Sequence, residues 1–269
     1  MHHKCLVPSV LRVLCVLIGS STFVQAGEPK TADEVIAKYI EAIGGRKAID
    51  AVKSMRVTAK LTMGGGMEAP MVIESKRPNK MRVEFTFQGM TATQAYDGKI
   101  GWSIMPFAGK TEPEKMPPDQ IEMFENQADM DGPLVDYKKK GHQVELIGKD
   151  EIEGSDVYKL KLTRKNGNVE YHYLDVEYFI PIKMEGKRKF QGTEIDFAFV
   201  LGDYKEVNGL LIAHSIQPQG GGMGGNITLE KVEMNVPMPD ERFAMPEVKK
   251  AETTAKSKKE DKDDAKDQG

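Results

Sequence analysis

Cysteine is nearly absent from this 269-residue chain, and both of its cysteines, Cys5 and Cys15, lie within the first 26 residues. The rest of the chain therefore has no disulfide, no thiol nucleophile and no thiolate metal ligand. The chain also lacks a run of about twenty apolar residues, the length that a membrane-spanning helix needs. We therefore expect no stable membrane insertion.

Positive charge is not in excess. The chain has 38 Lys and Arg against 41 Asp and Glu, a net charge of −3, which becomes −5 without Lys4 and Arg12. Because charges of both signs are dispersed along the sequence, we expect no basic patch for nucleic acid or for an anionic membrane surface.

Recognisable catalytic motifs are missing as well. After residue 26 the only histidines are His142, His172 and His214, which lack zinc-ligand spacing, and no Gly-x-Ser-x-Gly elbow presents a nucleophile. We expect these histidines at the surface or at strand edges. Acidic residues are plentiful, but nothing singles out a catalytic carboxylate pair. The sequence therefore predicts no enzyme activity, no cofactor and no metal site.

Methionine, in contrast, is plentiful. Met63, Met67 and Met71 are four residues apart, but Gly64–Gly66 lies between them and makes a helix implausible. A Cu(I) site of thioether sulfurs is one interpretation of these residues. The favoured one is an adaptable apolar lining, because methionine is unbranched and repacks around varied partners.

The two ends of the chain differ from its middle. Residues 1–26 have a basic start, a short apolar run and the small-x-small sequence Val24-Gln25-Ala26, which predicts a secretory signal peptide and export to the periplasm. Residues 249–269 are mostly charged and predict a disordered tail. The stretch between them, 27–248, is long enough for a single domain with one core.

Most of this domain has the pattern of short antiparallel strands. Apolar and polar residues alternate over 57–63 and again over 81–87, which places one side of each strand in an apolar interior. Tight turns are predicted at 76–79, 97–99 and 166–167. After Gly141 further strands are predicted at 144–147, 157–162, 169–173, 182–189, 195–201, 211–216 and 227–234.

Helical periodicity occurs near the N-terminus and in the middle of the chain. Thr31 and Glu34 have the spacing of a capping box before an amphipathic helix at 32–43, and a short turn of helix is predicted at 46–52. Within residues 108–143, which break the strand pattern, Pro117-Pro118-Asp119 opens another helix.

Three motifs, in this order and spacing, resemble the LolA-like periplasmic carriers that sort outer membrane lipoproteins. The motifs are Lys76-Arg77-Pro78-Asn79, Asp97-Gly98-Lys99, and Trp102 followed by Pro106-Phe107. The resemblance runs from about residue 31 to about residue 246. It implies a mainly β fold in which a strongly curved antiparallel sheet forms an unclosed half barrel, with an N-terminal helix and inserted helices covering the open mouth.

The resemblance also implies a function. Such a protein is a soluble periplasmic monomer that holds the acyl chains of a lipoprotein or another lipid in an apolar cavity and carries them between membrane-bound donor and acceptor proteins. In this family the arginine of the Lys-Arg-Pro-Asn motif bonds backbone carbonyls of the lid and keeps the empty cavity closed, so the expected latch is Arg77.

The residues expected to line the cavity are apolar and are equally explicable as core. They are Met81, Val83, Phe85, Phe87, Trp102, Ile104 and Phe107. One alternative is a periplasmic sensor or protein-binding module of the same fold with no lipid cargo. Another is an enzyme or a copper carrier.

Overall fold

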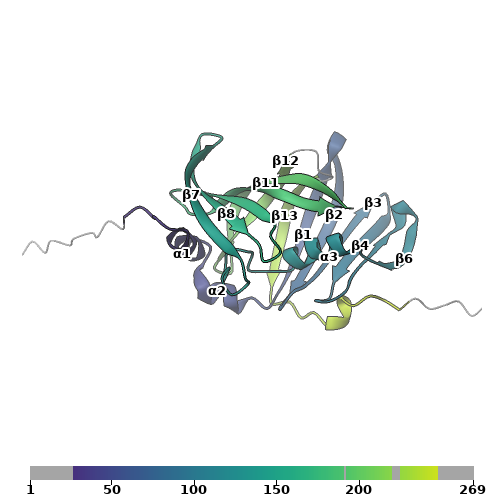
Figure 1. Cartoon of the computed structure of the whole chain (residues 1–269). Helices are drawn as coiled ribbons and strands as arrows, with labels where there is room; N and C mark the ends of the chain where they lie inside the picture. The colour runs from purple at the N-terminus through teal and green to yellow at the C-terminus, as the bar shows by residue number, and fades with distance from the viewer. Residues whose placement is uncertain (1–26, 191, 220–224, 248–269) are drawn as a thin grey trace, which may run out of the picture.

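Residues 27–190, 192–219 and 225–247 are described by the computed structural model, in which thirteen strands form one antiparallel sheet (Figure 1). The predicted signal peptide and charged tail lie outside the described residues. The strands are β1 (Ser54–Met63), β2 (Met67–Lys76), β3 (Lys80–Phe87), β4 (Met90–Tyr96), β5 (Gly101–Met105), β6 (Lys110–Lys115), β7 (Gln143–Ile152), β8 (Ser155–Thr163), β9 (Val169–Asp175), β10 (Pro181–Phe190), β11 (Thr193–Val207), β12 (Leu210–Gln219) and β13 (Asn226–Met234). The helices are α1 (Ala32–Ala42), α2 (Gly45–Ala51) and α3 (Pro118–Gln127).

The sheet is an unclosed half barrel. Its strand order is β6-β5-β4-β3-β2-β1-β13-β12-β11-β10-β9-β8-β7, so β1 pairs with β13 in the middle, and β6 and β7 are the two edges. Among the described residues no strand pairing joins these edges. The strands predicted from alternation and the mainly β fold class are thus confirmed.

Strand β6 was not expected. Residues 108–143 were predicted to break the strand pattern, but Lys110–Lys115 forms β6, which pairs with β5. Pro113 is tolerated in this strand because β6 lies at an edge, where a missing backbone donor does not interrupt the sheet.

The two faces of the sheet can be told apart from the strand register. Residues directly opposite each other on paired strands lie on the same face, so Met81, Tyr96 and Gly101 share one face. Gly101 lies against Met116 and Ile121, the latter on α3. We call this the inner face, and the opposite one the outer face.

Helix α1 covers the inner face near the β7 edge. Its predicted capping box is present, because the Thr31 hydroxyl accepts from the backbone N–H of Glu34 and the Glu34 carboxylate accepts from that of Thr31. The buried residues Val35 and Ile36 of α1 pack in one cluster with Leu160 of β8. The predicted short second helix is α2.

Helix α3 lies across the inner face, where it contacts β3, β4, β5 and β10 (Figure 1). Phe124 in the last turn of α3 and Ala128 just after its end are buried against Met81 and Tyr96. The helix therefore joins the N-terminal strands to the C-terminal half of the sheet.

The segment after β13 packs on the outer face. Trp102 is buried there, and its indole N–H donates to the backbone carbonyl of Phe243 at 2.8 Å. Phe243 itself is fully buried. Nearby, Arg242 and Arg56 form ion pairs with the carboxylate of Glu74, which is also buried.

Candidate functional site

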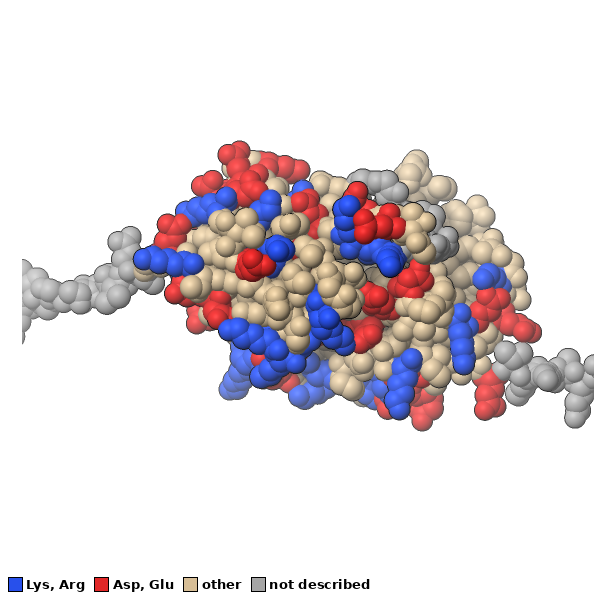
Figure 2. Space-filling model, in the orientation of Figure 1, with Lys and Arg blue, Asp and Glu red and all other residues tan. Residues whose placement is uncertain are grey.

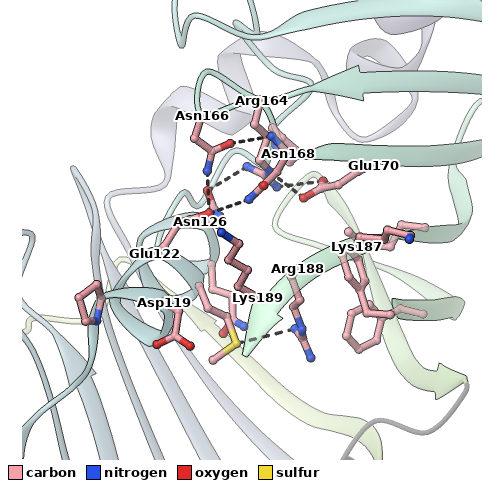
Figure 3. A pocket seen from close by; sticks show the side chains of 17 residues that line it. Asp119, Glu122, Asn126, Arg164, Asn166, Asn168, Glu170, Lys187, Arg188 and Lys189 are labelled. Carbon is pink, nitrogen blue, oxygen red and sulfur yellow. Dashed lines mark hydrogen bonds and ion pairs between the residues drawn. The ribbon is translucent and has the colours of Figure 1, made fainter. Parts of the chain in front are cut away.

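Two cavities lie between the helices and the inner face. The α3 cavity, of about 510 Å³, lies between α3, the turn at 164–168 and strands β9 to β11 (Figure 3). The α2 cavity, of about 350 Å³, lies between α1, α2, the segment after α3 and strands β11 and β12. Phe199 and Leu201 of β11, two residues apart and so on one face, line one cavity each.

Apolar side chains dominate the α2 cavity. Tyr39, at its wall, has a pKa raised to about 12, because burial disfavours the phenolate and the charge of Asp131 adds to that effect. Its apolar lining consists of Ile43, Ile49, Val52, Met55, Met130, Pro181, Leu201, Leu210, Leu211, Ile212 and Ala213.

Arg77, the predicted latch, lies at the wall of the α2 cavity. Its Nε donates to the carbonyl of Val52 at 2.6 Å, and one terminal nitrogen donates to the carbonyl of Ile49 at 3.0 Å. The guanidinium also forms a bidentate ion pair with the carboxylate of Asp131, one bond of which is 2.8 Å long. A single side chain thereby joins the β2–β3 turn to α2 and to the segment after α3.

The charges of this pair stabilise each other. Burial alone would raise the pKa of Asp131, but the hydrogen bonds and charge of Arg77, helped by Lys140 and Arg46, outweigh it and lower that pKa. The bonds to Asp131 also raise the pKa of Arg77. Both groups are only partly exposed, with 25% of the Arg77 side chain and 13% of the Asp131 side chain accessible.

A second buried ion pair lies at the end of the α3 cavity near the 164–168 turn. Arg164 donates to both carboxylate oxygens of Glu170, at 2.6 and 3.0 Å, and to the side-chain oxygen of Asn126 on α3 at 3.1 Å (Figure 3). Burial would raise the pKa of Glu170, but hydrogen bonds from His172 and Arg164 lower it to about 2. This pair ties the β8–β9 turn to α3.

Two of the histidines were misplaced by the prediction. His172 and His214 are buried, 4% and 6% exposed, on the interior strands β9 and β12, rather than lying at the surface or at strand edges. His172 is accommodated because its Nε2 lies 3.4 Å from the Glu170 carboxylate, and His214 because its Nδ1 lies 2.9 Å from the carbonyl of Ile212.

The predicted lining residues lie on both faces of the sheet. Those of β3 point to the inner face, where Met81 packs below α3 and Phe85 contacts the ring of Phe107 at 5.4 Å between centroids. Trp102 and Ile104 alternate with Gly101 and therefore lie on the outer face. None of the predicted residues Met81, Val83, Phe85, Phe87, Trp102, Ile104 and Phe107 lines the α2 or the α3 cavity.

Sequence reasoning missed the polar residues of the α3 cavity. Arg164 and Glu170 flank the Asn166-Gly167 turn that the sequence did predict, and opposite charges on the two sides of a hairpin turn are a readable sign of a cross-strand pair. Nothing in the sequence signals that Asn126, 38 residues earlier, joins them.

The described residues contain no group of three or more His, Cys, Asp or Glu residues placed to hold a metal ion. No helix among them is both long and apolar enough to cross a membrane.

Similarity to known proteins is seen in the structure. The sequence matches no protein-family model and no curated protein. Similar solved structures include a LolA superfamily protein from Nitrosomonas europaea, 16% identical with a TM-score of 0.52, and a DUF1329 family protein from Desulfovibrio piger, 12% identical with a TM-score of 0.55. Each match covers 80% of this chain and 98% of the other. The open half barrel with helices over its inner face is therefore a LolA-like fold, as the motifs implied.

Proposed function

We propose that this protein carries lipids, holding the acyl chains of a lipoprotein or of another lipid against the inner face of the half barrel. The observation that carries the proposal is the α2 cavity, an apolar space whose wall includes Arg77, the residue that bonds both α2 and the segment after α3. Volumes of 350 and 510 Å³ are in the range of small-molecule sites.

Loading is proposed to require movement of the segment at 126–133. This segment lies between the two cavities, because Asn126, Gln127 and Pro133 line the α3 cavity whereas Met130 and Gly132 line the α2 cavity. Release of Asp131 from Arg77 frees the segment to move away from the sheet, and the two cavities then join. Entering acyl chains would thus break the latch as they load.

Around the cavities, the apolar residues of β3 and Phe107 are proposed to extend the lipid-binding wall. Trp102 and Ile104 are not part of this wall, because they lie on the outer face of the sheet. On the face shown in Figure 2, acidic and basic side chains are interspersed, and we assign no nucleic-acid partner to the protein.

The wider setting belongs to the same proposal. The protein is a periplasmic monomer, exported by the signal peptide at 1–26, with a single domain at 27–248 and without enzymatic activity. Membrane-bound donor and acceptor proteins supply and receive its cargo in lipoprotein sorting.

Lipid extraction tests this function. The exported protein is purified without detergent, and organic extracts of the wild type and of Arg77→Leu are compared by mass spectrometry. We expect diacyl lipid or lipoprotein in both, with more retained by the variant because its latch is missing. Lys231→Leu, which removes an exposed charge on β13, is the control and should match the wild type.

Clean extracts from every variant, together with no uptake of added lipid, would refute the carrier and favour a protein-binding module. Retention that rises equally in Lys231→Leu would show that Arg77 is not the latch.

A further inference from the structure

Arg188 of β10 brings a positive charge to the wall of the α3 cavity. Among the described residues it has no ion pair, and its Nε is buried with no hydrogen-bond partner. Its polar contact is a weak one, from a terminal nitrogen to the sulfur of Met123 at 3.7 Å (Figure 3). The guanidinium also lies over the ring of Phe197, 5.3 Å from the ring centre.

The acidic groups of this cavity are engaged elsewhere. The carboxylate of Glu170 is paired with Arg164, and that of Glu122 accepts from the side-chain amides of Asn166 and Asn168. The carboxylate of Asp119 accepts from the backbone N–H groups of Gln120 and Gly192. None of these three carboxylates forms an ion pair with Arg188, so among the described residues its charge has no direct partner.

A partly buried guanidinium whose Nε has no acceptor is unfavourable, because that N–H has lost water and gained no equivalent partner. Burial accordingly lowers the pKa of Arg188. The side chains beside it on the cavity wall, including Met123, Met184, Phe197 and Phe199, are apolar and suit a hydrocarbon chain. An amphiphile with one negative group could pair that group with Arg188 and pack its hydrocarbon chain against these apolar side chains.

Building on the proposed carrier function, we propose that Arg188 binds the anionic head of an acyl ligand, a carboxylate or a phosphate, inside the α3 cavity. The acyl chain lies along the Met and Phe side chains of the inner face. Arginine suits this role because its planar donors match the oxygens of either group. The site selects charged lipids over neutral ones of the same length.

Displacement of a neutral apolar dye, N-phenyl-1-naphthylamine, from the purified protein at pH 8 tests the site. The competitors are hexadecanoate, hexadecyl phosphate and hexadecan-1-ol, each below its critical micelle concentration. We expect both anions to displace the dye at concentrations about tenfold lower than the alcohol, in keeping with a charge-assisted hydrogen bond. Arg188→Met should remove this difference, and Arg188→Lys should keep most of it.

Two controls separate binding from folding. Lys205→Met removes an exposed charge on β11 and should behave as the wild type. Without ligand, Arg188→Met should have a higher Tm than the wild type, because it removes a partly buried charge whose Nε has no acceptor. A residue that merely held the fold would lower the Tm when replaced.

The outcomes distinguish this site from the carrier function. Dye binding with no preference for the anions, or an equal loss of all three competitors in Arg188→Met, would overturn the head-group site and leave the carrier standing. Competition by inorganic phosphate alone would assign the cation to a free anion instead. Failure of the dye and of every amphiphile to bind would refute both proposals.

Discussion

Arg77 and Asp131 are 54 residues apart in the sequence, yet the guanidinium of Arg77 holds both carboxylate oxygens of Asp131. The same guanidinium bonds the carbonyls of Val52 and Ile49 at the end of α2. Arg77 therefore holds together α2 and the segment after α3, both of which cover the α2 cavity. It is also the residue that the Lys-Arg-Pro-Asn motif indicated.

Breaking this pair should be costly. Arg77→Leu leaves a partly buried carboxylate and two carbonyls without their donor, and we expect a loss of about 3 kcal/mol in the free energy of unfolding. Because the two residues share one interaction, the double variant Arg77→Leu/Asp131→Leu should lose about 1 to 3 kcal/mol less than the sum of the single variants. Urea denaturation measures all three, and additive losses would show that the pair does not act as a unit.

Acid should weaken the fold through Glu170. Its pKa falls from the ordinary value of 4.5 to about 2 in the folded protein, so its contribution is complete above pH of about 4.5 and is lost as the pH falls toward 2. The contribution amounts to about 3 kcal/mol. Glu170→Gln should be less stable than the wild type at pH 7, because Arg164 remains buried without its charge partner, and the difference should shrink at low pH.

Urea denaturation at several pH values between 2 and 7 checks this expectation. Glu145→Gln, which removes an exposed partner of Lys161, serves as the control and should show little difference at any pH. A wild type and Glu170→Gln with parallel pH profiles would contradict the assignment.

The segment after β13 should behave as part of the core. Phe243 is fully buried and its carbonyl accepts from Trp102, the single tryptophan of the chain. Phe243→Ala should cost about 3 to 5 kcal/mol and shift the tryptophan emission to longer wavelength as water reaches the indole. The exposed Glu241→Ala is the matched control. Unchanged emission in Phe243→Ala would mean that this segment does not shield Trp102.

Local patterns in the sequence were enough to predict most of the strands of the sheet and helix α1. Alternation over 81–87 and the Thr31–Glu34 capping box depend on neighbouring residues alone, and both are confirmed. Alternation also shows that Trp102 and Ile104 share a face.

Which face is the inner one depends on distant segments. Residues 235–247 cover Trp102, and α3 covers Met81. Alternation shows which residues share a face, but only these packing partners, far along the chain, show which face is the inner one. For the same reason the sequence did not predict the Arg164–Asn126 contact or the buried Nε of Arg188 without an acceptor. Whether such a polar group finds a hydrogen-bond partner depends on the tertiary packing of the curved sheet against α3.

Variants at Met81 of β3 and at the neighbouring Phe107 should distinguish a residue of the core from a residue of the lipid-binding wall. Met81 is 7% exposed and packs against Phe124, so Met81→Ala should cost about 2 to 5 kcal/mol in stability. Phe107 is 40% exposed, although its ring contacts Phe85, so Phe107→Ala should cost less than about 1 kcal/mol. If the inner face binds acyl chains, Phe107→Ala should nevertheless weaken dye and lipid binding several-fold. Unchanged binding in Phe107→Ala would show that Phe107 is not part of the lipid-binding wall. The lipid site would then be limited to the two cavities.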